Sequence, residues 1–261
     1  MATTPAVFIG HGSPSSAIQP NEFTASWSEF AAMVEKPKAI LSISAHWFIG
    51  ATAVTAMERP RTIHDFYGFP DEMFAIQYPA PGSLELAERA AGLITSVDVM
   101  KDNGEWGLDH GTWAPLLYLY PRADVPVVQL SINGREDFDF HLSLGAQLAP
   151  LMDEGVMLFG TGNVVHNLGK VNWGMPSAGF DWAKRFSEHV REIMRTDPSK
   201  LPSVTEHPDF RLAVPTPDHF MPLLYIAGVA AARGAKVSTI CDGYDLGSLS
   251  MTSYRVDTDN F

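Results

Sequence analysis

The sequence predicts an α/β fold: a three-layer sandwich with a central, mostly parallel or mixed sheet flanked by helices. Short apolar runs alternate along the chain with longer segments of helical spacing, which is the order typical of such folds. The apolar runs are nearly continuous, as expected of strands covered on both faces. The chain has 261 residues, 46% of them hydrophobic, and it shows no repeat or flexible linker. We therefore expect residues 1–261 to form a single domain.

Five segments are expected to be strands because each is a short, β-rich apolar run. In chain order they are residues 5–9, 39–45 (AILSISA), 125–131 (VPVVQLS), 156–160 (VMLFG) and 236–241 (KVSTIC). The first of them ends abruptly in GHG, which presents His11 between two glycines.

Six longer segments have the apolar spacing of helices. In chain order they are residues 22–34, 84–95, 113–119, 139–153, 181–195 and 219–233. Two further stretches, 57–83 and 197–218, are rich in proline and charge. We expect them to be long loops over one rim of the sheet, and loops of that length are often functional.

Composition excludes several classes of partner. The net charge is −12 and no Lys/Arg cluster occurs, so we expect neither a nucleic acid nor an anionic membrane to bind. No apolar run reaches the length of a bilayer span, and the start of the chain lacks the pattern of a signal peptide. The lone Cys241 precludes an internal disulfide and suits a reducing compartment. The expectation is a cytoplasmic protein, either a monomer or a small homo-oligomer.

Five of the nine histidines occupy positions from which they can meet. His11, His46 and His166 follow the first, second and fourth expected strands. His110 lies in the Gly-flanked turn DHGTW, and His219 lies in PTPDHF at the start of an apolar helix. Ligands of open α/β sheets bind outside the carboxyl ends of the strands. We therefore expect these imidazoles to reach one pocket at the rim.

Several imidazoles without a nearby pair of cysteines indicate a mononuclear metal site rather than a structural zinc cage. Neutral imidazole suits zinc, iron, copper or nickel, so the ligands alone do not choose the metal. Of the other histidines, His141, His189 and His207 are expected to be structural or solvated. His64, beside Asp65 in the first long loop, either lines a pocket or caps a turn.

Two other motifs are weak matches to known sites. GTGNVV follows a strand as a dinucleotide fingerprint would, but Val165 occupies the third glycine position and Asp181 opens a helix. GHGS lacks the glycines of a G-x-S-x-G nucleophile elbow at His11 and Ser15. Neither a nucleotide-binding protein nor a serine hydrolase is favoured.

Seven motifs occur in the order seen in extradiol ring-cleavage dioxygenases of the 4,5-DOPA dioxygenase type, within the class III extradiol superfamily. Between residues 9 and 251 they are GHGSP, SAHW, TIHDF, DHGTW, GTGNVVHNL, PTPDHFMPLLY and GSLSM. The chain resembles this family over nearly its whole length. The resemblance implies a single-domain α/β fold, a mononuclear metal, and cleavage of a catechol ring next to its hydroxyl pair by dioxygen.

Carried over motif by motif, the resemblance makes His11, His46 and His219 the metal ligands. His166 stands beside the metal as an acid/base or additional ligand, and His110 is a second candidate for proton transfer or for contact with dioxygen. We expect His166 to be the principal acid/base and His110 its partner, with the opposite order left open. Fe(II) is expected for activity, with Zn(II) as an alternative metal in the purified protein.

The resemblance also implies a substrate such as L-DOPA, whose cleaved product cyclises to betalamic acid. His64 and neighbouring aromatic residues would border it. Tyr67 and Tyr225 are candidates for substrate contact, and Arg61 and Asp65 for its polar tail, by their place in loops or motifs alone.

Three hypotheses remain at this stage. The first is a ferrous extradiol dioxygenase, whose third metal ligand the family pattern makes His219. A carboxylate is a common third ligand in non-haem iron oxygenases, and Asp218 is adjacent to His219. A zinc-dependent hydrolase can use the same three-His site, with bound hydroxide as nucleophile. A non-catalytic protein that binds a metal or a catechol is the third, although mere binding needs no extra groups for proton transfer.

Overall fold

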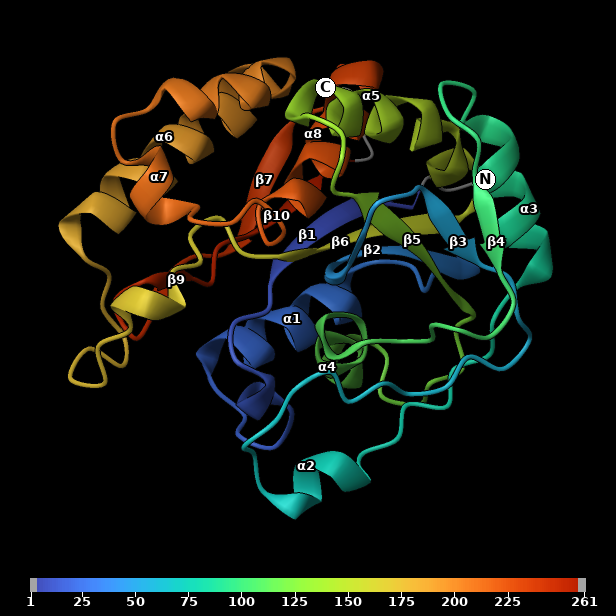
Figure 1. Ribbon diagram of the computed structural model, residues 1–261, viewed down its shortest axis with the longest axis horizontal. Helices are drawn as coiled ribbons and strands as arrows, with labels where there is room; N and C mark the ends of the chain where they lie inside the picture. The colour runs from blue at the N-terminus through green and yellow to red at the C-terminus, as the bar shows by residue number, and fades with distance from the viewer. Residues whose placement is uncertain (1–3, 258–261) are drawn as a thin grey trace.

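The structure is a computed structural model that describes residues 4–257 (Figure 1). Its strands are β1 (Ala6–Gly10), β2 (Ala39–Ile49), β3 (Ala53–Thr55), β4 (Met100–Asp102), β5 (Val127–Asn133), β6 (Val156–Gly162), β7 (Val237–Cys241), β8 (Tyr244–Asp245), β9 (Leu249–Ser250) and β10 (Ser253–Val256). All but β8 and β9 form one sheet in the order β4-β3-β5-β2-β6-β1-β10-β7. β8 and β9 pair with each other.

The sheet is mixed, as the sequence predicts. β1 and β2 both pair in parallel with β6, β2 pairs in parallel with β5, and β3 pairs in parallel with β4. β10 runs antiparallel to β1 and β7, and β3 runs antiparallel to β5. The carboxyl ends of β1, β2 and β6 therefore lie at the same edge of the sheet, where the first, second and fourth predicted strands were expected to bring their histidines.

The α-helices are α1 (Glu22–Met33), α2 (Asp71–Ala75), α3 (Leu84–Leu93), α4 (His110–Leu119), α5 (Phe138–Leu148), α6 (Asp181–Thr196), α7 (Phe210–Ala213) and α8 (Met221–Arg233). Short 3₁₀ helices span η1 (Pro14–Ala17), η2 (Ala149–Glu154), η3 (Leu168–Lys170) and η4 (Pro198–Glu206). Within residues 4–257, no helix is long and apolar enough to cross a membrane.

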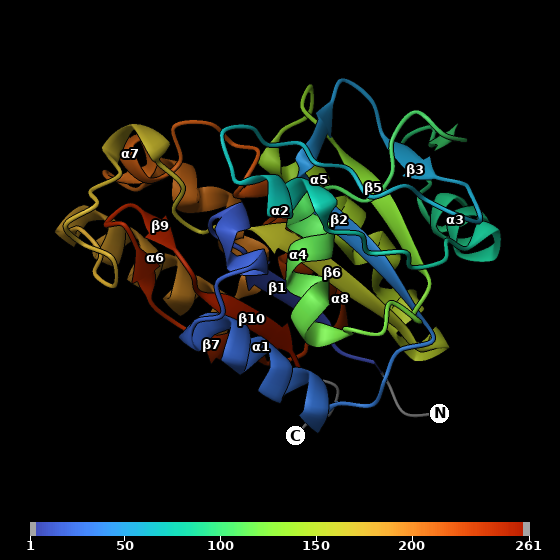
Figure 2. The same ribbon diagram turned by 90° about the horizontal axis from the view of Figure 1, so that it is seen from below.

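Helices cover both faces of the sheet. α1 and α4 lie on one face and α5 and α8 on the other, as Figures 1 and 2 show from two directions. The buried strand β1 explains this arrangement, because successive side chains of a strand point to opposite faces. Phe8 packs into the core beneath α5 and α8, whereas Val7 and Ile9 pack with Trp27 of α1 and Trp113 of α4. This is the predicted three-layer sandwich.

Two sequence predictions need correction, and a third holds for most of its length. The stretch 197–218 is not a long irregular loop, because most of it forms η4 and α7, whose Leu201 and Val204 are buried in the core. The stretch 57–83 is mostly irregular but includes the short helix α2. β2 continues beyond its predicted end, so His46 lies within the strand, at an irregularity in the register with β5.

Candidate metal centre

His11 is the first residue after β1 and is 3% exposed. Gly12 follows it with a φ of 62°, a left-handed conformation that glycine adopts without strain. His11 Nδ1 lies 2.9 Å from Thr161 Oγ1, and that hydroxyl donates to the carbonyl oxygen of Gly111. Because the hydroxyl proton is already used, Oγ1 accepts from His11 Nδ1–H. The lone pair of His11 is therefore on Nε2.

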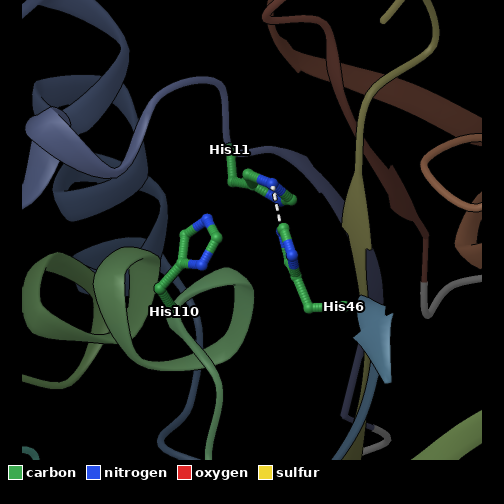
Figure 3. A group of neighbouring side chains, drawn as sticks. All are labelled: His11, His46 and His110. Carbon is green, nitrogen blue, oxygen red and sulfur yellow. Dashed lines mark hydrogen bonds between the residues drawn. The ribbon is translucent and has the colours of Figure 1, made fainter. Parts of the chain in front are cut away.

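His46 lies within β2 and faces His11 (Figure 3). Its Nδ1 lies 3.1 Å from Asp65 Oδ2, and its Nε2 lies 3.2 Å from His11 Nε2. Since an ionised carboxylate only accepts hydrogen bonds, the Nδ1 of His46 also carries the proton. When both rings are neutral, this short contact joins two lone pairs that repel each other. Either a metal ion between the two Nε2 atoms or a second proton on His46 removes that repulsion.

His110 is the first residue of α4, and its imidazole points toward the same space (Figure 3). Asp109 caps the helix by accepting from Thr112 N, and Asp65 accepts from both the backbone N and the Nδ1 of His110. The ring centroids of His46 and His110 are 3.9 Å apart. The start of α4 therefore places a third imidazole beside the first two.

His219 and His166 complete the cluster. Their rings stack with centroids 3.5 Å apart, and the His219 ring lies 5.4 Å from that of His11 and 5.1 Å from that of His46. The carboxylate of Asp218 is hydrogen-bonded to His219 Nδ1. Within residues 4–257, the His166 imidazole has no hydrogen-bond partner. All five histidines singled out in the sequence thus meet at one place.

The arrangement fits a divalent metal ion. Two imidazole nitrogens that bind one ion at about 2.1 Å are separated by about 3.0–3.4 Å for ordinary ligand angles, and the Nε2 atoms of His11 and His46 are 3.2 Å apart. Ligand atoms of His11, His46 and His110 all lie within 4.8 Å of one another. Geometry thus groups His110 with His11 and His46 most tightly, whereas the family motifs select His219 as their partner.

Electrostatics keep most of the cluster neutral, which is the form of imidazole that binds a metal. Burial lowers the pKa of His11, His110, His166 and His219, to about 2 for His166 and about 4 for His219, and the neighbouring imidazoles lower these pKa values further. Burial also opposes charge on His46, but hydrogen bonding to Asp65 and nearby carboxylates raises its pKa.

Asp65 is the functional residue that sequence reasoning assigned incompletely. The sequence suggested it only as a contact for the polar tail of a substrate. In the structure its carboxylate contacts His46 and His110, and these hydrogen bonds outweigh burial to hold its pKa far below the usual range. The available signal was its place in TIHDF, which does not show which histidines the loop approaches.

The residues suggested for substrate contact are dispersed. His64 Nε2 lies 2.9 Å from the carbonyl oxygen of Ile76, and the side chain packs beside Phe66, which contacts the ring of His110. Tyr67 is 92% exposed. Tyr225 lies in α8, fully buried, with its hydroxyl 3.0 Å from His141 Nδ1 of α5. The structure thus brings His64 next to the site but holds Tyr225 in the packing between two helices.

The other histidines lie outside the cluster. His141 is fully buried in α5, and its ring contacts Tyr225. His189 of α6 pairs with His207, which follows η4, at a ring-centroid distance of 4.8 Å. Among the described residues, neither His141 nor the pair His189 and His207 belongs to a group of three imidazoles.

Comparison with known proteins places this geometry in context. A family model described as the catalytic LigB subunit of aromatic ring-opening dioxygenase matches residues 4–256. A protein named 4,5-DOPA dioxygenase extradiol from Escherichia coli (strain K12) is 44% identical over 257 residues, covering 97% of this chain and 94% of that protein. A protein of the same name from Beta vulgaris is 38% identical over 259 residues, covering 95% and 94%. The crystal structure of an uncharacterized protein from Escherichia coli K12 superposes with a TM-score of 0.85 at 39% identity, covering 97% of this chain and all of that one.

Proposed function

The chain belongs to the family of LigB catalytic subunits of aromatic ring-opening dioxygenases, and we propose that it cleaves L-DOPA between carbons 4 and 5 with one ferrous ion. Membership makes it a metal-dependent extradiol dioxygenase, an enzyme that inserts both atoms of dioxygen into a catechol. The observation that carries the proposal is the cluster of five buried or half-buried imidazoles, with two Nε2 lone pairs 3.2 Å apart. L-DOPA is proposed because relatives from bacteria and plants carry its name.

We assign the metal to His11, His46 and His219. Each of these rings has its Nδ1 held by an oxygen, respectively of Thr161, Asp65 and Asp218, so that Nε2 is free for the ion. Such hydrogen bonds fix the tautomer and orientation of metal-binding histidines. His110 is equally well oriented but shares the carboxylate of His46, and we assign it to proton transfer. Metal content of His110→Ala and His219→Ala separates the two assignments, because only the loss of a ligand removes the ion.

A divalent ion held by His11, His46 and His219 would lower the pKa of a catechol hydroxyl and would act as a template for catechol and dioxygen. The remaining work falls to the chain. His110 Nε2 accepts the second hydroxyl proton, and the carboxylate of Asp65 at its Nδ1 stabilises the resulting imidazolium, the role of the aspartate in hydrolase triads. His166, which has no hydrogen-bond partner among residues 4–257, is free to accept the other hydroxyl proton of the substrate and to return that proton during ring opening.

Iron is proposed because zinc has no accessible redox change and cannot pass electrons to dioxygen. The same histidines suit a zinc hydrolase, which is the second candidate function. It is favoured by the donor set alone, since three imidazoles with an open position are a common catalytic zinc arrangement.

The test is anaerobic removal of metal followed by reconstitution with Fe(II) or Zn(II), and addition of air and L-DOPA in an oxygen-electrode cell. We expect oxygen uptake with the iron form only, and a yellow product with the absorption of betalamic acid. Uptake with other catechols but not with L-DOPA would keep the dioxygenase and refute the substrate. No uptake with L-DOPA or with a panel of simple catechols would favour the zinc hydrolase.

A further inference from the structure

Asp65 holds a position that the ligand set alone does not require. It lies in the stretch 57–83, yet its side chain is only 15% exposed. Oδ2 lies 3.1 Å from His46 Nδ1 and 2.9 Å from His110 Nδ1, while Oδ1 accepts from the backbone N of His110 at 2.9 Å. One carboxylate thus connects a residue within β2 to the start of α4.

The loop around Asp65 is held in place on both sides. Ile63 N donates to the carbonyl oxygen of Leu108, and Trp113 Nε1 donates to the carbonyl oxygen of Ile63. On the other side, Phe66 is buried against the rings of His110 and Trp113. The carboxylate is therefore preorganised by the surrounding structure rather than drawn in by a ligand.

Acceptor chemistry determines the protons on both rings. A carboxylate that accepts from two imidazoles at once requires an N–H on each of the two Nδ1 atoms. Both rings are then the Nδ1–H tautomer, with a lone pair on each Nε2. If either ring had the other tautomer, two lone pairs would face each other at about hydrogen-bond distance.

We propose that Asp65 is a positioning residue that holds His46 and His110 in the same Nδ1–H tautomer, so that one Nε2 binds the metal and the other accepts a proton from the catechol. The inference deepens the proposed function and rests on it for the roles of the two rings. Its consequence is that metal affinity and proton acceptance depend on one carboxylate and are lost together.

The direct test is nitrogen NMR of protein labelled with ¹⁵N-histidine, first without metal and then with zinc. In the wild type we expect a protonated Nδ1 on both His46 and His110. In Asp65→Asn, the amide that replaces the carboxylate has one acceptor oxygen and one donor nitrogen. The backbone N–H of His110 keeps the amide oxygen at the position of Oδ1, so the amide nitrogen faces both Nδ1 atoms. The two rings should then change tautomer together, which a merely structural role of Asp65 would not produce.

The second readout is the dissociation constant for zinc, measured by titration of the metal-free protein. Loss of a hydrogen-bonding partner of a metal-binding histidine typically weakens affinity by about 10- to 100-fold, and we expect Asp65→Asn to fall in that range. Asp71→Asn, an exposed carboxylate in the same stretch, is the matched control and should bind zinc as the wild type does. Unchanged tautomers, or zinc affinity of Asp65→Asn within threefold of the wild type, would overturn the proposal.

If Asp65→Asn does not fold, Asp65→Ala provides a second test. Added formate should occupy the space left by the carboxylate and restore zinc affinity at least fivefold, and a folded variant without such rescue also refutes the role. None of these measurements uses catechol or dioxygen. Failure of the wild type to cleave L-DOPA would therefore refute the proposed function and leave the result for Asp65 unaffected.

Discussion

The close contact between Gly111 and His46 leads to the most sharply defined prediction. Gly111 is the second residue of α4, and a Cβ built on it would lie 2.6 Å from Ser44 Oγ and 2.7 Å from His46 Cδ2. Ordinary contacts begin near 3.4 Å, so Gly111→Ala must displace the His46 ring or α4 by about 0.7 Å. Metal–ligand distances tolerate about 0.2 Å. We therefore expect zinc affinity to fall by about 10- to 100-fold, the range found when a ligand loses its orientation.

The assay is titration of metal-free protein with zinc, combined with thermal unfolding. Helix propensity alone would make alanine more stable than glycine by about 0.5–1 kcal/mol, so a loss of affinity cannot come from a weaker helix. Gly92→Ala in α3, where an added Cβ meets no atom within 4 Å, is the matched control and should keep its zinc affinity. The reasoning is refuted if Gly111→Ala binds zinc within threefold of the wild type.

Three further predictions follow from the site and the core. Replacing His11, His46 or His219 by alanine, one at a time, should abolish stoichiometric metal binding, measured by elemental analysis after dialysis. A variant that keeps one metal ion per protein molecule removes that residue from the ligand set. His166→Ala should keep metal but lose turnover with L-DOPA, and normal turnover would exclude it from proton transfer. Burial lowers the pKa of His141 to about 4, so between pH 6.5 and 4 the unfolded chain gains a proton that the folded chain does not, and stability falls as the pH falls. At pH 5 this lowers the free energy of unfolding by about 2 kcal/mol. In His141→Gln the free energy of unfolding, measured with urea at pH 7 and at pH 5, should not show this decrease. An equal decrease in the wild type and the variant would contradict the prediction.

The clustering of the histidines at one edge of the sheet was predictable because local signals mark their positions. Glycine and proline flank His11, His110 and His219, and such residues indicate where a chain turns sharply after a strand or before a helix. Continuous apolar runs then indicate parallel strands whose carboxyl ends meet. These two local patterns are enough to predict that distant histidines meet at one edge of the sheet.

What could not be predicted depends on contacts between distant parts of the chain. β10 lies antiparallel between β1 and β7, and its four residues are too short to carry a pattern of their own. Asp65 lies in a loop whose path is set by the backbone hydrogen bond from Ile63 to Leu108. Tyr225 belongs to an apolar helix, and only the packing of α8 on α5 shows that its hydroxyl is directed at His141. Local sequence contains none of these pairings.

The wide separation of the histidines along the chain also bears on how the enzyme acquires its metal. The five rings come from residues 11 to 219, and β1 must pair with both β6 and β10 before the edge of the sheet is complete. Contacts of such long range form late, since their loops must close first. A chain in which these strands have not yet paired does not hold the five rings together. Binding to the native state alone stabilises that state by mass action, so the free energy of unfolding rises with the concentration of free metal.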